Sequence, residues 1–288
     1  MAVQVALIGE ARFCGGPRGT HAPAQQRRRA LEAHLHEVRV GRQAHLAGEA
    51  AHEAERIQSR HCGQLSQMNG PAGARMGFLE ARDLAPLATH PELEAERRKL
   101  EAELRSKHAG LDRQTLRDLP VMRAFTDHFK PFGKTYHVLL QLESVALKER
   151  PIPSRLCAVT ALFMAELKHG LVAAGHDLEK LVPTLRLGAS QGGEHYVGFG
   201  DKPIALPGGD LILRHEKGIL SSVLQGPDGA TPIQPTTRNV LYTLYAPDGI
   251  PTGVLEAQLE DLTFYVRTFA PDAKTETKIV PASVTAKG

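Results

Sequence analysis

The sequence predicts an α+β fold, and three observations support this prediction. Residues 89–170 contain several segments with apolar residues at helical spacing. Residues 184–245 instead contain short β-type runs that Gly and Pro separate. One more helical pattern, at residues 253–269, precedes a final β-type run. Helices and strands that are segregated along the chain indicate α+β rather than an alternating βαβ fold.

The first predicted elements are a strand over residues 77–84 and a helix that starts near Thr89. Pro91 fits the first turn of that helix, where its missing N–H costs nothing. A second helix is predicted to open at Asp118, and a third to cover residues 136–147. Each presents apolar residues on one face, so each is expected to pack on a common core.

The segment after Ser154 is apolar nearly all round from Leu156 to Leu167 and stops at Gly170. An all-round apolar helix lies in the centre of a fold. Short runs rich in β-branched and aromatic residues follow it and are predicted as strands, at residues 184–187, 195–199, 210–214, 219–224, 239–245 and 277–280.

Composition changes near residue 76. Residues 1–75 hold ten Arg, no Lys and six Glu, whereas residues 76–288 hold 25 Lys and Arg against 26 acids. The first segment is poor in aromatic residues and is expected to be disordered or loosely helical. The sequence therefore predicts a low-complexity extension at 1–75, a folded domain at 76–282 and a tail at 283–288.

The arginine cluster at residues 27–29 allows two interpretations, a contact with a phosphate backbone or a solvated, non-native extension. The histidines of the same segment are irregularly spaced and lack a Cys or carboxylate cluster, so no metal site is predicted.

Several classes of protein are excluded. No apolar run reaches 18 residues, and the N-terminus lacks a basic region followed by an apolar core, so neither a transmembrane helix nor a signal peptide is expected. The three Cys form no C-x-x-C pair. These features favour a cytoplasmic protein without a disulfide framework. Common nucleotide-binding, hydrolase and metalloprotease motifs are missing as well.

Several motifs share their order and spacing with one known family. Residues 152–181 contain an apolar helix that leads into a predicted Gly turn, GHDLEKL, at 175–181. Upstream, Phe132-Gly133 precedes Tyr136, and downstream lie PGGDLILR at 207–214, GIL at 218–220 and TTRNVL at 236–241. Over about 200 residues the chain resembles the B3/B4 domain of the phenylalanyl-tRNA synthetase beta subunit.

This resemblance implies a B3/B4-like α+β domain that handles amino acids or aminoacyl-tRNA. In the synthetase the domain hydrolyses tyrosine that is wrongly attached to the phenylalanine tRNA. A free-standing relative is expected to act in trans, with aminoacyl-tRNA or an amino-acid-like molecule as partner and without a cofactor. Ester hydrolysis requires a shaped pocket, oxyanion donors and a positioned water.

The sequence departs from the family pattern in the apolar helix. Leu156, Thr160 and Phe163 occupy positions that are usually polar in the family. Because buried polar groups discriminate strongly for a hydroxyl, the change weakens the expectation of tyrosine specificity. The alternatives are a different amino acid, a free small molecule or no catalysis.

The candidate site residues follow from the motifs. His176 is predicted to orient a water or ester oxygen, and Asp177 to fix its tautomer or hold an α-amino group; the alternative is a packed imidazole and a capping carboxylate. Glu166 is either a buried pocket carboxylate or, as favoured here, a solvated residue near the helix end. Further substrate-binding candidates, which could equally be ordinary turn or strand residues, are Gln225, Asp228, Thr237 and Thr243. Cys157 is predicted to be a small core residue.

The sequence thus favours an aminoacyl-tRNA deacylase or a related amino-acid-binding module. One alternative is a non-catalytic binding protein for an amino-acid-like ligand or for RNA. Another is a small-molecule enzyme of secondary metabolism that has repurposed the pocket. The near-neutral charge of residues 76–288 gives weight to these alternatives, because tight RNA binding depends on Lys and Arg contacts to phosphate.

Overall fold

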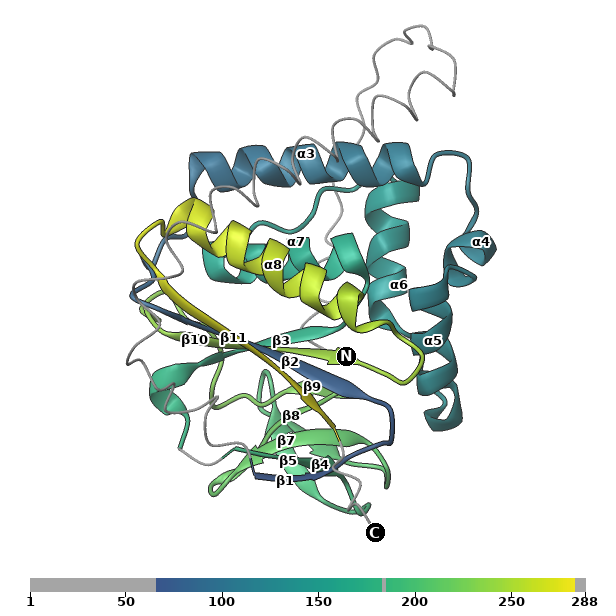
Figure 1. Ribbon diagram of the computed structural model, residues 1–288, viewed down its shortest axis with the longest axis vertical. Helices are drawn as coiled ribbons and strands as arrows, with labels where there is room; N and C mark the ends of the chain where they lie inside the picture. The colour runs from purple at the N-terminus through teal and green to yellow at the C-terminus, as the bar shows by residue number, and fades with distance from the viewer. Residues whose placement is uncertain (1–65, 183–184, 283–288) are drawn as a thin grey trace, which may run out of the picture. The chain divides into compact units, whose positions relative to one another are not determined.

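The computed structural model describes residues 66–182 and 185–282 (Figure 1). The arginine cluster, the histidine-rich stretch and the predicted tail lie outside these residues. Within them, helices are followed by antiparallel strands and by one late helix before the last strand. The predicted α+β class is therefore confirmed.

A four-stranded antiparallel sheet forms the centre of the described fold. Its strands lie in the order β11-β2-β10-β3, with bounds Lys274–Pro281, Arg75–Arg82, Val240–Ala246 and Ala173–Asp177. Every residue of β10 is buried, as expected for an inner strand with both faces covered. Leu241 of β10 lies opposite His176 of the edge strand β3.

Helices α7 (Cys157–His169) and α8 (Thr252–Phe269) cover one face of this sheet (Figure 1). The hydroxyl of Tyr242 on β10 donates to the backbone carbonyl of Ala158 in α7, at 3.0 Å. On β2, Gly77 leaves room for α8, since a Cβ there would lie 3.0 Å from the Leu255 Cδ1 atom. As predicted, α7 is central: its residues from Thr160 to Leu167 are all buried.

The remaining helices extend the core beyond this layer. Helix α3 (Pro91–Lys107) begins at the predicted proline and contacts α7 and α8. The others come from residues 113–147 and are α4 (Arg113–Arg117), α5 (Pro120–Phe129), η2 (Lys130–Phe132), α6 (His137–Leu142) and η3 (Glu143–Leu147). Phe125 of α5 stacks on Tyr136 with ring centroids 4.2 Å apart, which fixes the entry to α6.

A second sheet is built mainly from the later strands. Its order is β1-β4-β7-β8-β9, with bounds Ser66–Asn69, Arg186–Ala189, Leu211–His215, Gly218–Ser222 and Gly226–Pro227. A separate hairpin pairs β5 (His195–Gly198) with β6 (Lys202–Ala205). An isolated bridge between Gly198 and Asp228 links this hairpin to the loop after β9.

The strand β1 lies on the N-terminal side of the predicted boundary at residue 76. It pairs in parallel with β4. Two backbone hydrogen bonds of 2.8 Å also join this region to the chain end, from Gly70 N to the Ala282 carbonyl and from Ala282 N to the Ala74 carbonyl. Residues 66–75 therefore contribute backbone pairing to the fold.

The main difference from the predicted elements concerns residues 173–177. The sequence predicts a Gly turn at residues 175–181, but residues 173–177 form β3, and their carbonyl and N–H groups pair with β10. Asp177 then caps the short 3₁₀ helix η4 (Leu178–Lys180), as the alternative interpretation of this residue predicts. His176 therefore lies within a strand and not on a turn.

No helix within the described ranges is long and apolar enough to cross a bilayer.

Candidate functional site

The His176 ring is completely buried on β3, where it contacts the loop that follows β9. Its Nδ1 atom lies 2.8 Å from the Thr231 hydroxyl oxygen. That hydroxyl donates in turn to the Asp228 carboxylate, which also accepts the Thr231 backbone N–H at 3.2 Å. The three side chains form a hydrogen-bonded series, Asp228–Thr231–His176.

This series determines the tautomer of the imidazole. A threonine hydroxyl has one hydrogen, and here that hydrogen goes to Asp228. Nδ1 of His176 must therefore carry a proton and donate to the Thr231 oxygen. Burial, and secondarily the neighbouring His215, lower the pKa of His176 to about 4, so the ring is neutral at pH 7. Its Nε2 atom is left with a lone pair.

Nε2 of His176 has no hydrogen-bond partner among the described residues, although it is fully buried. An unpaired polar atom in the interior costs about 1–3 kcal/mol, and native folds keep few of them. Such an atom marks a place where a water or a ligand group can bind. A neutral imidazole nitrogen with a lone pair can accept a proton as a general base does, and a pKa of about 4 makes this one a weak base at pH 7.

His176 and Asp177 point to opposite faces of the central sheet, because consecutive strand residues alternate. The Asp177 carboxylate accepts the Thr237 hydroxyl at 2.8 Å and the Glu179 backbone N–H at 3.1 Å. The partner of the His176 ring is therefore Thr231, with Asp228 behind it, rather than Asp177. Asp177 and Thr237 are nevertheless brought together, as a second buried pair.

Glu166 is wrongly predicted as a solvated residue, since its side chain is completely buried in α7. One carboxylate oxygen accepts the Ala173 backbone N–H at 3.0 Å, and the other has no partner among the described residues. Burial raises the pKa of Glu166 to about 8. Helix α7 covers the sheet face to which Tyr242 points, whereas His176 and Leu241 face the other way. Glu166 is thus separated from His176 by the sheet.

Gln225 and Thr243 lie nearer to His176. Thr243 is buried on β10 on the same sheet face as Leu241, two residues further along the strand. Gln225 begins the loop that carries Asp228, and its side-chain oxygen accepts the Lys134 ammonium at 3.1 Å. Of the predicted residues, the structure places Asp228 in direct contact with the His176 series and Gln225 at the start of the same loop.

A second carboxylate–hydroxyl pair holds the beginning of this loop. The Ser222 hydroxyl donates to the buried Asp210 carboxylate and accepts the Gln225 backbone N–H at 2.9 Å. Burial raises the pKa of Asp210 to about 6. With Asp228–Thr231 on the far side of β9, the segment from the end of β8 to Thr231 is held by a buried carboxylate on each side.

Sequence reasoning missed Thr231, Asp210 and Ser222. The spacing Asp228-x-x-Thr231 is a local signal, because a carboxylate commonly accepts the backbone N–H three residues later in a capping turn. Nothing local links Asp210 to Ser222, since their contact depends on the pairing of β7 with β8.

Other chemistry is disfavoured at the described residues. Cys157 is buried, and burial raises the pKa of its thiol to about 11, so it is the core residue predicted and not a nucleophile. Residues 66–182 and 185–282 contain no group of three His, Cys, Asp or Glu side chains arranged to hold a metal ion.

Comparisons with known proteins give similarity at the level of structure and not of sequence. No family model matches the chain, and no curated protein matches it in sequence. Among solved structures, the chain is similar to an N-terminal fragment of the phenylalanyl-tRNA synthetase beta subunit from Pyrococcus horikoshii, with a TM-score of 0.37 and 9% identity. The match covers 72% of this chain and 50% of that one, so the chain spans about half the length of the fragment.

Proposed function

We propose that this chain binds an aminoacyl ester and hydrolyses it, as a free-standing deacylase of aminoacyl-tRNA. The observation that carries the proposal is the His176 Nε2 atom, a buried lone pair at the end of the Asp228–Thr231–His176 series. The choice of an aminoacyl ester comes from the sequence motifs that resemble the B3/B4 domain.

The proposed reaction needs only a water and the groups of this chain. Nε2 of His176 accepts a proton from water as the water oxygen attacks the ester carbonyl carbon. The bond from that carbon to the ribose oxygen then breaks, and the proton passes from His176 to the leaving oxygen. The products are the free amino acid and the tRNA hydroxyl. Thr231 and Asp228 keep the ring in the tautomer that can accept the proton.

Access to His176 requires a movement, because the ring is completely buried. The segment that follows β9 carries Thr231, which contacts the ring, and Asp228, which binds the Thr231 hydroxyl. A substrate would therefore enter as this loop opens and would be enclosed as it closes, which excludes bulk water from the ester.

The test is deacylation of a panel of charged and mischarged tRNAs, including Tyr-tRNA(Phe), by the full chain. We expect His176→Ala to lower the rate by about 100-fold or more. The matched control is His195→Ala, since His195 is an exposed histidine on β5. Release of no amino acid above the spontaneous rate, by a protein shown to be folded, would contradict the proposal.

A second pair of variants tests whether activity depends on the hydroxyl of Thr231, which orients the His176 ring, or only on the volume of its side chain. Thr231→Ser keeps the hydroxyl that links His176 to Asp228, and Thr231→Val keeps the volume but removes the hydroxyl. We expect the serine variant to retain most of the activity. The valine variant should lose kcat with little change in KM, because it alters the tautomer of the base and not substrate contacts.

Non-catalytic binding of an amino-acid-like ligand is the second candidate function. The complete burial of His176 favours it, because a buried imidazole can hold an enclosed small ligand through Nε2. Calorimetric titration with each standard amino acid tests it. Binding of one amino acid without hydrolysis of any ester in the tRNA panel would support this candidate over the first.

A further inference from the structure

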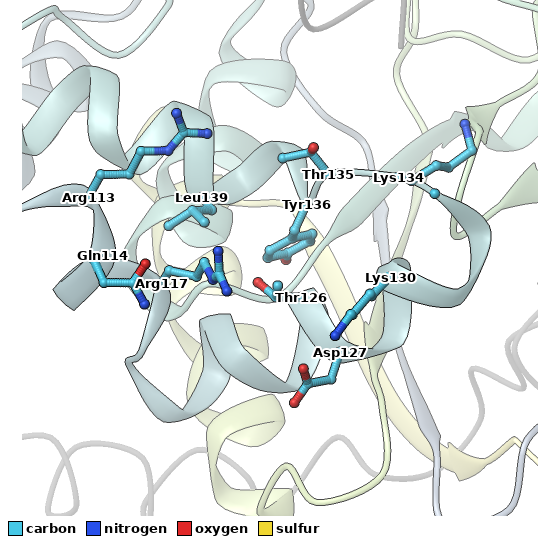
Figure 2. Close-up of a pocket in the computed structure, with 11 residues that line it drawn as sticks. Arg113, Gln114, Arg117, Thr126, Asp127, Lys130, Lys134, Thr135, Tyr136 and Leu139 are labelled. Carbon is cyan, nitrogen blue, oxygen red and sulfur yellow. The ribbon is translucent and has the colours of Figure 1, made fainter.

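A concave surface lies between α4, α5 and the turn that leads into α6 (Figure 2). Its volume is about 630 Å³. The charged side chains in its lining are four cations and one carboxylate, namely Arg113, Arg117, Lys130, Lys134 and Asp127. Positive charge is therefore concentrated here, although residues 76–288 as a whole are close to neutral. A local excess of cations in a concave surface attracts anionic ligands.

Two of these cations have side chains with no hydrogen-bond or ion-pair partner within the described residues. Arg113 lies 3.3 Å from the Glu143 carboxylate, and Lys134 donates to Gln225. The side chains of Arg117 and Lys130 are exposed and make no hydrogen bond or ion pair with another residue that the structure describes. Figure 2 shows the Arg117 side chain extending from α4 toward Thr126, while Lys130 lies on the opposite side of the cavity.

The other lining residues suit a phosphate ester. Gln114 and Thr135 can donate hydrogen bonds at the rim, and the buried side chains of Tyr136 and Leu139 close the floor. The Arg117 guanidinium matches the oxygen geometry of a phosphate and can donate two parallel hydrogen bonds. The volume falls within the range of small-ligand pockets, so it can hold about one nucleotide.

We propose that this groove binds the phosphate groups of a nucleotide or of an RNA strand. The groove is concave, whereas a flat membrane surface would contact residues that protrude from the protein. The shape therefore disfavours a lipid surface as the ligand. The inference does not depend on hydrolysis at His176. If the ligand is RNA, the hydrogen bond from Lys134 to Gln225 places the groove beside the loop that carries Asp228.

Amide hydrogen exchange of the full chain, measured with and without each probe, shows which residues the ligand protects. The probes are a single-stranded RNA oligonucleotide, adenosine monophosphate, poly-glutamate and vesicles that contain phosphatidylserine. We expect the RNA or the mononucleotide to slow exchange within residues 113–139. Protection by the mononucleotide alone would identify a small ligand, and protection by RNA would identify a strand. No protection of residues 113–139 by either, or protection by poly-glutamate or vesicles only, would overturn the proposal.

A charge-matched pair of double variants tests the two unpaired cations. Arg117→Gln with Lys130→Gln should weaken RNA binding about 10-fold at roughly 0.1 M salt and should reduce the salt slope by about 1.4, since each single-strand phosphate contact contributes about 0.7. The control is Arg98→Gln with Lys99→Gln, which removes two exposed cations from α3. Equal weakening by both pairs would overturn the proposal. The RNA-binding assay involves no hydrolysis, so its result does not depend on the result of the deacylation assay.

Discussion

At the scale of single residues, the buried acid Glu166 contributes to how stability depends on pH. Its folded pKa of about 8 lies above the value of 4.5 for a free side chain. The folded state therefore holds a proton that the unfolded state has lost, and the free energy of unfolding falls as pH rises from about 4.5 to about 8.

Glu166→Gln should remove this pH dependence, because the amide is neutral at every pH and can still accept the Ala173 N–H. We expect the variant to be more stable than the natural protein near pH 7, by up to about 3 kcal/mol, and equally stable near pH 4.5. Urea unfolding of both proteins between pH 4.5 and 8 measures the difference. A constant gap across this range would show that Glu166 does not titrate as inferred.

Two buried tyrosines of β10 differ in one hydrogen bond. The Tyr242 hydroxyl donates to the Ala158 carbonyl, whereas the Tyr245 hydroxyl has no partner among the described residues. Tyr242→Phe should therefore lower the free energy of unfolding by about 1 kcal/mol, while Tyr245→Phe should leave it unchanged or raise it slightly. Chemical denaturation of both variants provides the comparison, and an equal loss in both would contradict the assignment.

At the scale of elements, the β5–β6 hairpin and the Asp228 loop are in close backbone contact. The Gly229 N–H donates to the Val197 carbonyl at 2.9 Å, and a Cβ at Gly229 would lie 2.6 Å from the Gly198 carbonyl oxygen. Any side chain at this position would thus push the hairpin away from the loop.

Gly229→Ala should lower the free energy of unfolding by about 1–3 kcal/mol, because the clash is with backbone and cannot be relieved by a rotamer change. The same substitution should displace Asp228 and Thr231 and reduce any deacylation. Gly253→Ala in α8 is the matched control. Its Cβ would meet only the Glu256 carboxylate at 4.0 Å, so it should be neutral or stabilising. Thermal unfolding of the two variants would distinguish these outcomes.

The elements also show what a sequence can predict. Helices α3 and α7 and the strands β7 and β10 lie close to their predicted positions, since apolar periodicity and turn residues are local signals. Strand β3 was missed because its residues, AAGHD, have neither β-branched side chains nor alternation; it forms through pairing with β10. For the same reason His176 could be chosen as a candidate, but its partner Thr231, which lies 55 residues away, could not.

At the scale of the whole molecule, residues 66–75 connect the two ends of the described fold. Strand β1 covers an edge of the second sheet, and residues 70 and 74 bond to Ala282. A chain that starts at residue 76, the boundary that composition predicts, would lose these hydrogen bonds and leave the edge of β4 unpaired.

We therefore expect a chain that starts at residue 66 to be more stable than one that starts at Met76, by about 1–3 kcal/mol. Denaturant unfolding of both proteins tests this. Removal of residues 1–65 alone should have a smaller effect on the same transition. Equal unfolding midpoints for the two shortened chains would show that the stable fold begins at residue 76, where the composition changes.

The burial of His176 has a consequence for its reactivity toward reagents. An acylating reagent for imidazole can reach Nε2 only while the covering loop is open, although the neutral ring is intrinsically reactive. When closing is faster than modification, the labelling rate equals the intrinsic rate multiplied by the fraction of molecules that are open. The exposed His195 reports the intrinsic rate in the same sample. The ratio of the two labelling rates thus gives the equilibrium population of the open loop without any substrate being known.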